Sequence, residues 1–246
     1  MKRIDVGFDK ITKIAHLADV HIRNVKRHKE YKKVFNKLYK DLKATLPKQG
    51  GLIYLAGDKA AKALPENSII YLAGDIVHAK TEMSPELISM TSELFTKLSK
   101  IAPTILIAGN HDCNLNNKHR LDALTPIVDS LQLDNFYYLY DTDIYEIADC
   151  YFVVESVFDS PDKYIKADQV PNDKTKIALH HGPVTSARTD VGYELQGDLS
   201  VEDFKGFDYV MLGDIHKHQY LDRKKRIAYA SSLVCQNFGE HPTNHG

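Results

Sequence analysis

Five short segments of this 246-residue chain combine aspartate, histidine and asparagine at the spacing of metal ligands. In chain order they are Asp19-x-His21, Asp75-x-x-His78, Asn110-His111-Asp112, His180-His181 and Asp214-x-His216-x-His218. Carboxylate oxygens, imidazole nitrogens and an amide oxygen form a ligand set suited to Mn, Fe, Zn or Mg. One histidine at a strand end usually has a structural role, whereas five such clusters in separate segments indicate a shared metal centre.

The elements that must position these clusters are short apolar strands. The runs "TKIAHLADVH", "SIIYLAGD", "PTILIAGNHD", "TKIALHHG" and "FDYVMLGDIH" are apolar without alternation, and each contains a cluster at its end. Continuous runs of this length are typical of strands that are buried on both faces. Because the C-terminal ends of strands in an α/β sheet face a common crevice, we expect the clusters to converge there.

Helical patterns separate several of these strands, so the fold class is α/β. The clearest helix covers residues 29–46, and a second covers 84–100 with Ser84 as its N-cap. A shorter helix is expected at about 121–131. Residues 136–158 are interpreted as consecutive strands that form antiparallel hairpins.

The pentapeptide YLAGD occurs twice, ending once at Asp58 and once at Asp75. His78 follows Asp75 by three residues, whereas no histidine lies within reach of Asp58. We therefore predict that Asp75 is a metal ligand and that Asp58 is a surface residue.

The composition excludes some classes of protein. Three cysteines, Cys113, Cys150 and Cys235, lie far apart, which fits a reducing compartment and offers no disulfide framework. No apolar run is long enough for a signal peptide or a membrane span, so a cytoplasmic location is expected. The net charge of −1 argues neither for nor against a nucleic-acid partner.

Two basic stretches leave the substrate class open. Residues 22–43 are rich in lysine and arginine, and "RKKR" occupies residues 223–226. The first is either the solvated face of a helix or a surface that contacts phosphates, and the second is either a hairpin tip or such a surface. Arg188 is a further candidate near the crevice, although its spacing does not place it. Since tryptophan is absent, a stacking platform for single strands is not indicated.

The five ordered clusters resemble the signature of the calcineurin-like metallophosphoesterases, which reads DxH, GDxxH, GNH[DE], a histidine motif and GHxH. Within that superfamily, "LHHGPV", "YVMLGDIHKHQ" and "IAYASSLVCQNFGE" are most similar to the SbcD-type branch, the nuclease subunits of double-strand-break repair complexes. The resemblance runs from about Ile14 to Glu240. It implies a four-layer α/β/β/α sandwich with a dinuclear metal centre at one edge.

The resemblance implies two groups of metal ligands that share one bridging carboxylate. The first group would be Asp19, His21 and His216, the second Asn110, His180 and Asp214, and the bridge Asp75. Two divalent cations would clamp the phosphate oxygens and activate the attacking water. Mn is the expected metal, with Mg, Fe or Zn as alternatives.

Three further residues would act on the substrate. The resemblance implies that His111 protonates the leaving-group oxygen as general acid and that His78 helps to hold the phosphate. Asp112, the neighbour of His111 in the chain, is predicted to orient the His111 imidazole.

Two choices between neighbouring ligands stay open. Asp214 stands where the family has the first histidine of GHxH, and this carboxylate favours Mn or Mg over Zn. His218 is the competing ligand for the second metal. His181 competes with His180 in the same way, and the HQG wording of the SbcD-type branch favours His180.

The activity implied by the resemblance is that of a DNA exonuclease or endonuclease of repair or recombination, acting in the cytoplasm, nucleoid or nucleus. Such nucleases work with an SbcC-type coiled-coil ABC ATPase, and a homodimer is a further candidate assembly. The alternatives are a phosphoesterase for a small nucleotide or phosphoprotein, and a DNA-binding scaffold that binds metal weakly. We expect one domain over residues 1–246, without the DNA-capping region usual in SbcD-type proteins.

Overall fold

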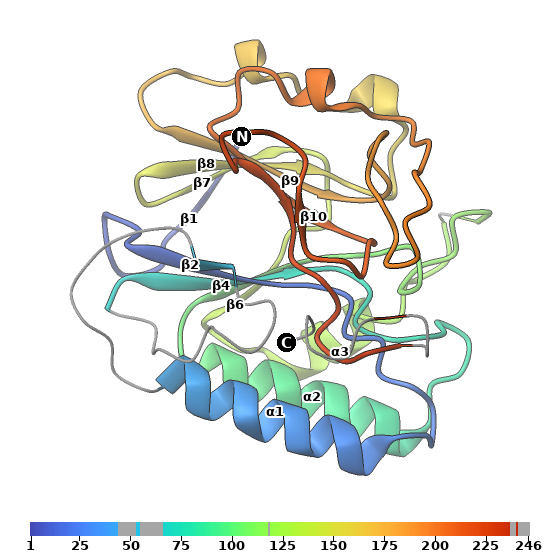
Figure 1. Ribbon diagram of the computed structural model, residues 1–246. Helices are drawn as coiled ribbons and strands as arrows, with labels where there is room; N and C mark the ends of the chain where they lie inside the picture. Colours follow the sequence, from blue (N-terminus) through green and yellow to red (C-terminus); the bar gives the residue numbers. More distant parts are fainter. Residues whose placement is uncertain (44–52, 55–65, 118, 237–239, 241–246) are drawn as a thin grey trace.

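The computed structural model describes residues 1–43, 53–54, 66–117, 119–236 and 240 (Figure 1). Two β-sheets lie face to face, and helices α1 and α2 run side by side beneath one of them (Figure 1). Asp58, the aspartate of the first YLAGD copy, lies outside the described residues.

The sheet next to the helices has five strands in the order β3-β2-β4-β5-β6, and all neighbouring strands are parallel. Its strands are β2 (Lys13–Leu17), β3 (Ile53–Tyr54), β4 (Ser68–Ala73), β5 (Thr104–Ile107) and β6 (Phe136–Tyr138). The helices that accompany it are α1 (His28–Lys43), α2 (Pro85–Ser99) and α3 (Thr125–Leu131).

The second sheet has seven strands in the order β1-β7-β8-β9-β10-β12-β11. The pairs β7–β8 and β11–β12 are antiparallel, and the other neighbours are parallel. Its strands are β1 (Lys2–Ile4), β7 (Ile144–Ile147), β8 (Cys150–Glu155), β9 (Thr175–His181), β10 (Tyr209–Gly213), β11 (Gln219–Tyr220) and β12 (Ile227–Tyr229).

Apolar side chains fill the three spaces between four layers. In β4, Ile70 and Leu72 belong to the cluster beneath α1 and α2, whereas Ile69 and Tyr71 belong to the cluster between the two sheets. Successive side chains of a strand point to opposite faces, so β4 is buried on both. Each fully buried side chain of this size contributes about 1.5–3 kcal/mol of hydrophobic stabilisation. The predicted doubly buried strands are therefore confirmed.

The predicted helices form, and residues 44–46 of the first one lie outside the described residues. Helix α2 begins at Pro85, and Ser84 caps it by accepting a hydrogen bond from the backbone N–H of Leu87 at 3.3 Å. Helix α3 is shorter than expected and begins at Thr125. No helix in the described part of the chain is long and apolar enough to cross a bilayer.

The outer layer over the seven-stranded sheet is built from three short 3-10 helices. These are η1 (Pro161–Lys163), η2 (Ala167–Gln169) and η3 (Val201–Phe204), and they are the short coils at the top of Figure 1. The predicted four-layer α/β arrangement is confirmed, with 3-10 turns in the place of a longer α-helix. Pro161 and Pro171 in this region lack the N–H that an uninterrupted helix would need.

The prediction of consecutive hairpins over residues 136–158 is wrong for its first strand. Strand β6 pairs in parallel with β5 of the five-stranded sheet, and only β7 and β8 form a hairpin in the other sheet. The chain therefore crosses from one sheet to the other between Tyr138 and Ile144. Local residue types indicate strands, but the pairing of β6 depends on a strand about thirty residues away in the chain.

Candidate metal centre

Five parallel strands carry polar side chains to the same edge of the molecule. Asp19 and His21 follow β2, Asp75 and His78 follow β4, Asn110 and His111 follow β5, His181 ends β9, and Asp214 and His216 follow β10. Side chains from all five strand ends lie within a few ångströms of one another. The predicted convergence of the five clusters at the C-terminal ends of the strands is therefore confirmed.

Three of the aspartates occupy left-handed backbone conformations. The φ angles are 51° for Asp19, 51° for Asp75 and 94° for Asp214. Aspartate enters this region more readily than most residues, but the conformation is uncommon outside glycine and concentrates at functional sites. The same left-handed conformation at three aspartates indicates that the surrounding structure constrains where their carboxylates lie.

Two glycines allow the strand ends to approach closely. A Cβ atom on Gly109 would lie 2.1 Å from Oδ1 of Asp75, and one on Gly213 would lie 2.1 Å from the carbonyl oxygen of Ala73. Any side chain at either position would push the loops apart. The glycine that precedes Asn110 and the glycine that precedes Asp214 are therefore required by packing around the site.

The first group of possible ligands consists of Asp19, His21 and His216. Nε2 of His21 lies 3.1 Å from Nε2 of His216, and ligand atoms of all three residues lie within 4.8 Å of one another. Two nitrogens that are each about 2.1 Å from one ion, at an angle of about 90–110°, lie about 3.0–3.4 Å apart. The observed separation therefore fits two imidazoles that share one cation.

The second group surrounds Nε2 of His181. This nitrogen lies 3.1 Å from Oδ1 of Asn110 and 3.9 Å from Oδ1 of Asp214. Nδ1 of His181 lies 2.6 Å from the carbonyl oxygen of Ala73 and donates to it, so in the neutral ring the lone pair of Nε2 is available to a cation. A ring held in this way is prepared to bind a metal through Nε2.

Asp75 lies between the two groups. Its Oδ2 is 3.4 Å from Nε2 of His21, and its Oδ1 is 3.3 Å from Nε2 of His181. Each oxygen of one carboxylate thus faces a different imidazole group. This is the arrangement that a carboxylate bridging two cations requires.

The electrostatics of the site also favour cations. Burial raises the pKa of Asp19 to about 7 and raises that of Asp214. Burial opposes ionisation of Asp75 as well, but interaction with His181 and His21 lowers its pKa on balance. Among the described residues, no lysine or arginine forms an ion pair with these three carboxylates. Buried carboxylates without a lysine or arginine partner are stabilised by a bound metal.

His111 and His78 lie beside the first group. The rings of His111 and His78 are stacked with centroids 5.6 Å apart, and the His111 ring lies edge-on to His21 at 4.7 Å. The backbone N–H of His111 donates to Oδ1 of Asp75 at 2.9 Å. Both predicted substrate-contacting histidines are therefore at the site.

Asp112 does not orient His111. Its side chain is fully buried and accepts hydrogen bonds from the backbone N–H of Val77 at 3.0 Å and of Gly109 at 2.9 Å. Nδ1 of His111 instead donates to the carbonyl oxygen of His78 at 2.7 Å. The prediction for Asp112 is wrong, because its carboxylate points inward and ties the loop after β4 to the loop after β5.

His180 points away from the site, which corrects the choice between the two adjacent histidines. Its Nδ1 lies 3.3 Å from Oε2 of Glu155, and its ring contacts Tyr164 and Phe204 of the outer layer. Neighbouring residues of β9 face opposite sides of the sheet, so only His181 can reach Asp75. Because both faces of β9 are apolar, alternation in the sequence could not show which histidine faces inward.

His218 also lies outside the ligand cluster. Its Nδ1 donates to the carbonyl oxygen of Tyr229 at 2.8 Å, and its ring contacts Tyr220. Asp214, by contrast, has an oxygen within 3.9 Å of His181. Of the two competing residues, the structure brings only Asp214 to the second group.

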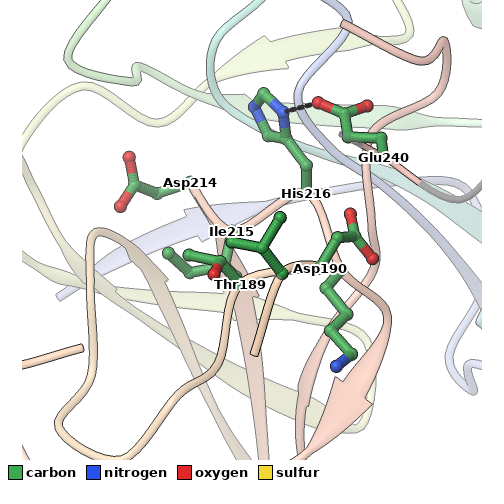
Figure 2. A pocket seen from close by; sticks show the side chains of 8 residues that line it. Thr189, Asp190, Asp214, Ile215, His216 and Glu240 are labelled. Carbon is green, nitrogen blue, oxygen red and sulfur yellow. Dashed lines mark hydrogen bonds and ion pairs between the residues drawn. The ribbon is translucent and has the colours of Figure 1, made fainter. Parts of the chain in front are cut away.

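Glu240 is a site residue that the sequence did not reveal. Nδ1 of His216 donates to Oε1 of Glu240 at 2.7 Å, and Glu240 is almost completely buried. Figure 2 shows the Glu240 carboxylate on one side of the His216 ring and Asp214 on the other. These residues line a cavity of about 240 Å³ together with residues 189–191. Glu240 follows no predicted strand and belongs to none of the five clusters, so its spacing contained no signal.

Comparison with known proteins agrees with this geometry. Residues 12–218 match the sequence model of a family described as Calcineurin-like phosphoesterase. The chain is also 45% identical, over 257 aligned positions, to "Uncharacterized protein R555" of Acanthamoeba polyphaga mimivirus. That alignment covers 100% of this chain and 18% of the relative, so the chain spans less than a fifth of the relative's length. Because the family match extends over most of the chain and includes all five ligand clusters, the chain belongs to the calcineurin-like phosphoesterase family.

Proposed function

We propose that this chain is a dinuclear-metal phosphodiesterase that cleaves DNA. Membership of the family supports a metal-dependent phosphoesterase. The observation that carries the proposal of two metals is the position of Asp75, whose two oxygens face His21 and His181 at 3.4 and 3.3 Å. A single-metal site would not need one carboxylate directed at two separate imidazole groups.

The residues of the two groups would hold the metals. Asp19, His21 and His216 would bind the first, Asn110, His181 and Asp214 the second, and Asp75 both. Bound divalent cations would neutralise the charge of the phosphodiester and lower the pKa of the attacking water. With four oxygen donors among seven ligands, the set favours Mn or Mg over Zn.

His111 is the proposed general acid. The carbonyl oxygen of His78 accepts its Nδ1–H at 2.7 Å, which fixes the ring, and the doubly protonated imidazole would give its Nε2 proton to the leaving oxygen. The His78 ring is stacked on His111 and would contact the same phosphate.

The charge of helix α1 supports a polyanionic substrate. Lys29, Lys32, Lys33 and Lys40 are exposed on this helix, and the helix begins seven residues after His21. The opposing Glu30 is already paired with Arg27 at 2.7 Å. A basic face on the helix that follows the first ligand loop in the chain would attract the phosphates of DNA independently of sequence. The resemblance to the SbcD-type branch supports the same substrate, and an SbcC-type ATPase partner and a homodimer stay predictions.

The test uses purified chain loaded with Mn²⁺ and end-labelled linear DNA. We expect DNA cleavage, and we expect Asn110→Ala and His111→Ala each to reduce the rate by about 100-fold or more. Asn117→Ala and His119→Ala, which change exposed residues of the same loop, are the matched controls and should cleave at the parental rate.

Two other results would replace this proposal. Hydrolysis of bis-p-nitrophenyl phosphate without cleavage of DNA would indicate a phosphoesterase for a small nucleotide or a phosphoprotein. Failure to bind Mn²⁺ would instead indicate a DNA-binding scaffold with a weak metal site.

A further inference from the structure

We propose that Glu240 is a positioning residue that directs Nε2 of His216 into the first metal site. This inference deepens the proposed function and rests on it. Oε1 of Glu240 lies 2.7 Å from Nδ1 of His216, while Nε2 of the same ring lies 3.1 Å from Nε2 of His21. The two nitrogens of one imidazole are thus divided between a carboxylate and the metal ligands.

The hydrogen bond to Glu240 selects the tautomer of the neutral His216 ring. Nδ1 of His216 carries the proton that Glu240 accepts, so in the neutral ring it is Nε2 that presents its lone pair to the site. A carboxylate partner also makes the imidazole a stronger ligand than a carbonyl partner does. Nδ1 of His181 and Nδ1 of His111 each donate to a carbonyl oxygen, at Ala73 and His78, so the carboxylate at Nδ1 distinguishes His216 from both.

The Glu240 carboxylate is itself held at both oxygens. Its Oε2 accepts a hydrogen bond from the backbone N–H of Gln236 at 2.7 Å and lies 3.4 Å from Oγ of Ser232. The whole residue is only 7% exposed. A carboxylate fixed in this way restrains the ring that it contacts, which an exposed and mobile carboxylate would not.

Residues 232–236 are anchored to His216 and to the loop that carries the other first-site ligands. The backbone N–H of Leu233 donates to the carbonyl of Ala18 at 3.2 Å, and that of Ser232 donates to the carbonyl of His216 at 3.3 Å. Asp19 follows Ala18 in the chain. These two backbone hydrogen bonds, which do not involve the Gln236 side chain, therefore set the position of His216 relative to Asp19 and His21. Nδ1 of His21 has no hydrogen-bond partner among the described residues.

The test compares Glu240→Ala and Glu240→Gln with the unsubstituted chain. Mn²⁺ affinity is measured by calorimetric titration, and ligand geometry by the visible absorption spectrum of the Co²⁺-loaded protein. We expect Glu240→Ala to weaken one of the two Mn²⁺ sites by about 10–100-fold and to change the Co²⁺ spectrum. Glu240→Gln keeps an acceptor for Nδ1–H and should recover part of the affinity.

The control separates positioning from a general effect on the segment. Gln236→Ala removes the side-chain contacts of this segment with Val20 and Val234 but leaves His216 untouched. It should keep the parental Co²⁺ spectrum. Equal loss of Mn²⁺ affinity in Gln236→Ala and Glu240→Ala, or parental affinity in Glu240→Ala, would overturn the inference.

The proposed function and this inference can fail separately. If the unsubstituted chain binds two Mn²⁺ ions but cleaves no DNA, the proposed function fails, and the affinities of the variants still decide the role of Glu240. If the unsubstituted chain binds no Mn²⁺, both are overturned.

Discussion

Asp75 is the residue through which the two ligand groups meet. It is 1% exposed, it follows the doubly buried strand β4, and its carboxylate faces His21 with one oxygen and His181 with the other. Oδ1 also accepts the backbone N–H of His111 at 2.9 Å. One side chain therefore contacts both metal-ligand groups and the loop of the proposed general acid.

Substitution of Asp75 tests this central position. Asp75→Asn removes the negative charge that two cations would share, so we expect loss of Mn²⁺ from both sites and a decrease in phosphodiesterase rate of at least about 10²–10³-fold. Metal content by mass spectrometry and hydrolysis of bis-p-nitrophenyl phosphate are the measurements. Asp58→Ala, in the other copy of YLAGD, should leave both unchanged, and an equal loss in the two variants would contradict the assignment.

The adjacent histidines of β9 provide a second test at this scale. His181→Gln removes a nitrogen that lies 3.1 Å from Asn110 and 3.3 Å from Asp75, so the second metal should be lost. His180→Gln changes a side chain on the opposite face and should keep both metals, although it should lower stability. Metal stoichiometry after gel filtration distinguishes the variants. Retention of two metals by His181→Gln would show that the geometry has been misassigned.

At the scale of elements, the alternation of side chains along β9 puts a candidate metal ligand on one face of the strand and a structural histidine on the other. The inward face of β9 carries His181 to the candidate metal ligands, and its outward face carries His180 against Glu155 of β8 beneath the 3-10 layer. Burial lowers the pKa of His180 to about 3 and raises the pKa of Glu155 to about 8. At neutral pH the buried pair is therefore uncharged, which burial in an apolar layer requires.

The Glu155 carboxyl makes stability depend on pH. Since its pKa is about 8 in the folded protein and about 4.5 in the unfolded chain, the folded state holds a proton that the unfolded state has lost between these values. The free energy of unfolding contributed by Glu155 is therefore highest at or below about pH 4.5 and falls as pH rises towards 8. The slope is at most about 1.4 kcal/mol per pH unit.

Glu155→Gln should remove this decline. Relative to the parent, the metal-free variant should gain stability as the pH of a urea titration is raised from about 5 to about 8. Glu202→Gln, which changes an exposed glutamate of η3, is the matched control. A difference between parent and Glu155→Gln that does not vary with pH would contradict the predicted protonation of Glu155.

At the scale of the whole molecule, the candidate metal ligands come from both sheets. Asp19 and Asp75 come from the five-stranded sheet, whereas His181 and Asp214 come from the seven-stranded sheet. A direct link already exists, because the backbone N–H of Asp214 donates to Oδ1 of Asp19 at 3.0 Å. Cations bound by ligands from both sheets would hold the same edge together more strongly.

Removal of metal should therefore destabilise the entire fold. A ligand that binds only the native state at 100 times its Kd adds about 2.7 kcal/mol of stability. For a chain of this size, that amount corresponds to a decrease in Tm of about 5–10 °C when EDTA removes the metal. Differential scanning calorimetry with and without EDTA is the measurement, and Mn²⁺ added in excess should restore the parental Tm. An unchanged Tm would argue against ligands that join the sheets.

Much of the fold and most of the ligand set could be predicted from the sequence. An apolar run such as that of β4 can be recognised from neighbouring residues in the sequence. A doubly buried strand that is followed by Gly74 and Asp75 indicates a tight turn that presents a carboxylate. Parallel strands then require the C-terminal clusters to meet at one edge, whatever the details of packing. The amino-acid sequence by itself therefore determined the α/β class, the strand ends that carry ligands, and the carboxylate, imidazole and amide chemistry of the site.

Only the tertiary structure decided which neighbour each side chain contacts. Contacts between segments far apart in the chain decide three features. They decide that His181 rather than His180 faces the ligand cluster, that a carbonyl is the partner of His111, and to which sheet β6 belongs. Glu240 is the clearest case, since it reaches His216 across 24 residues without any periodic pattern. The physical reason is that residue types limit the chemistry of a site, whereas the face and pairing of its strands determine which atoms come within about 3 Å of one another.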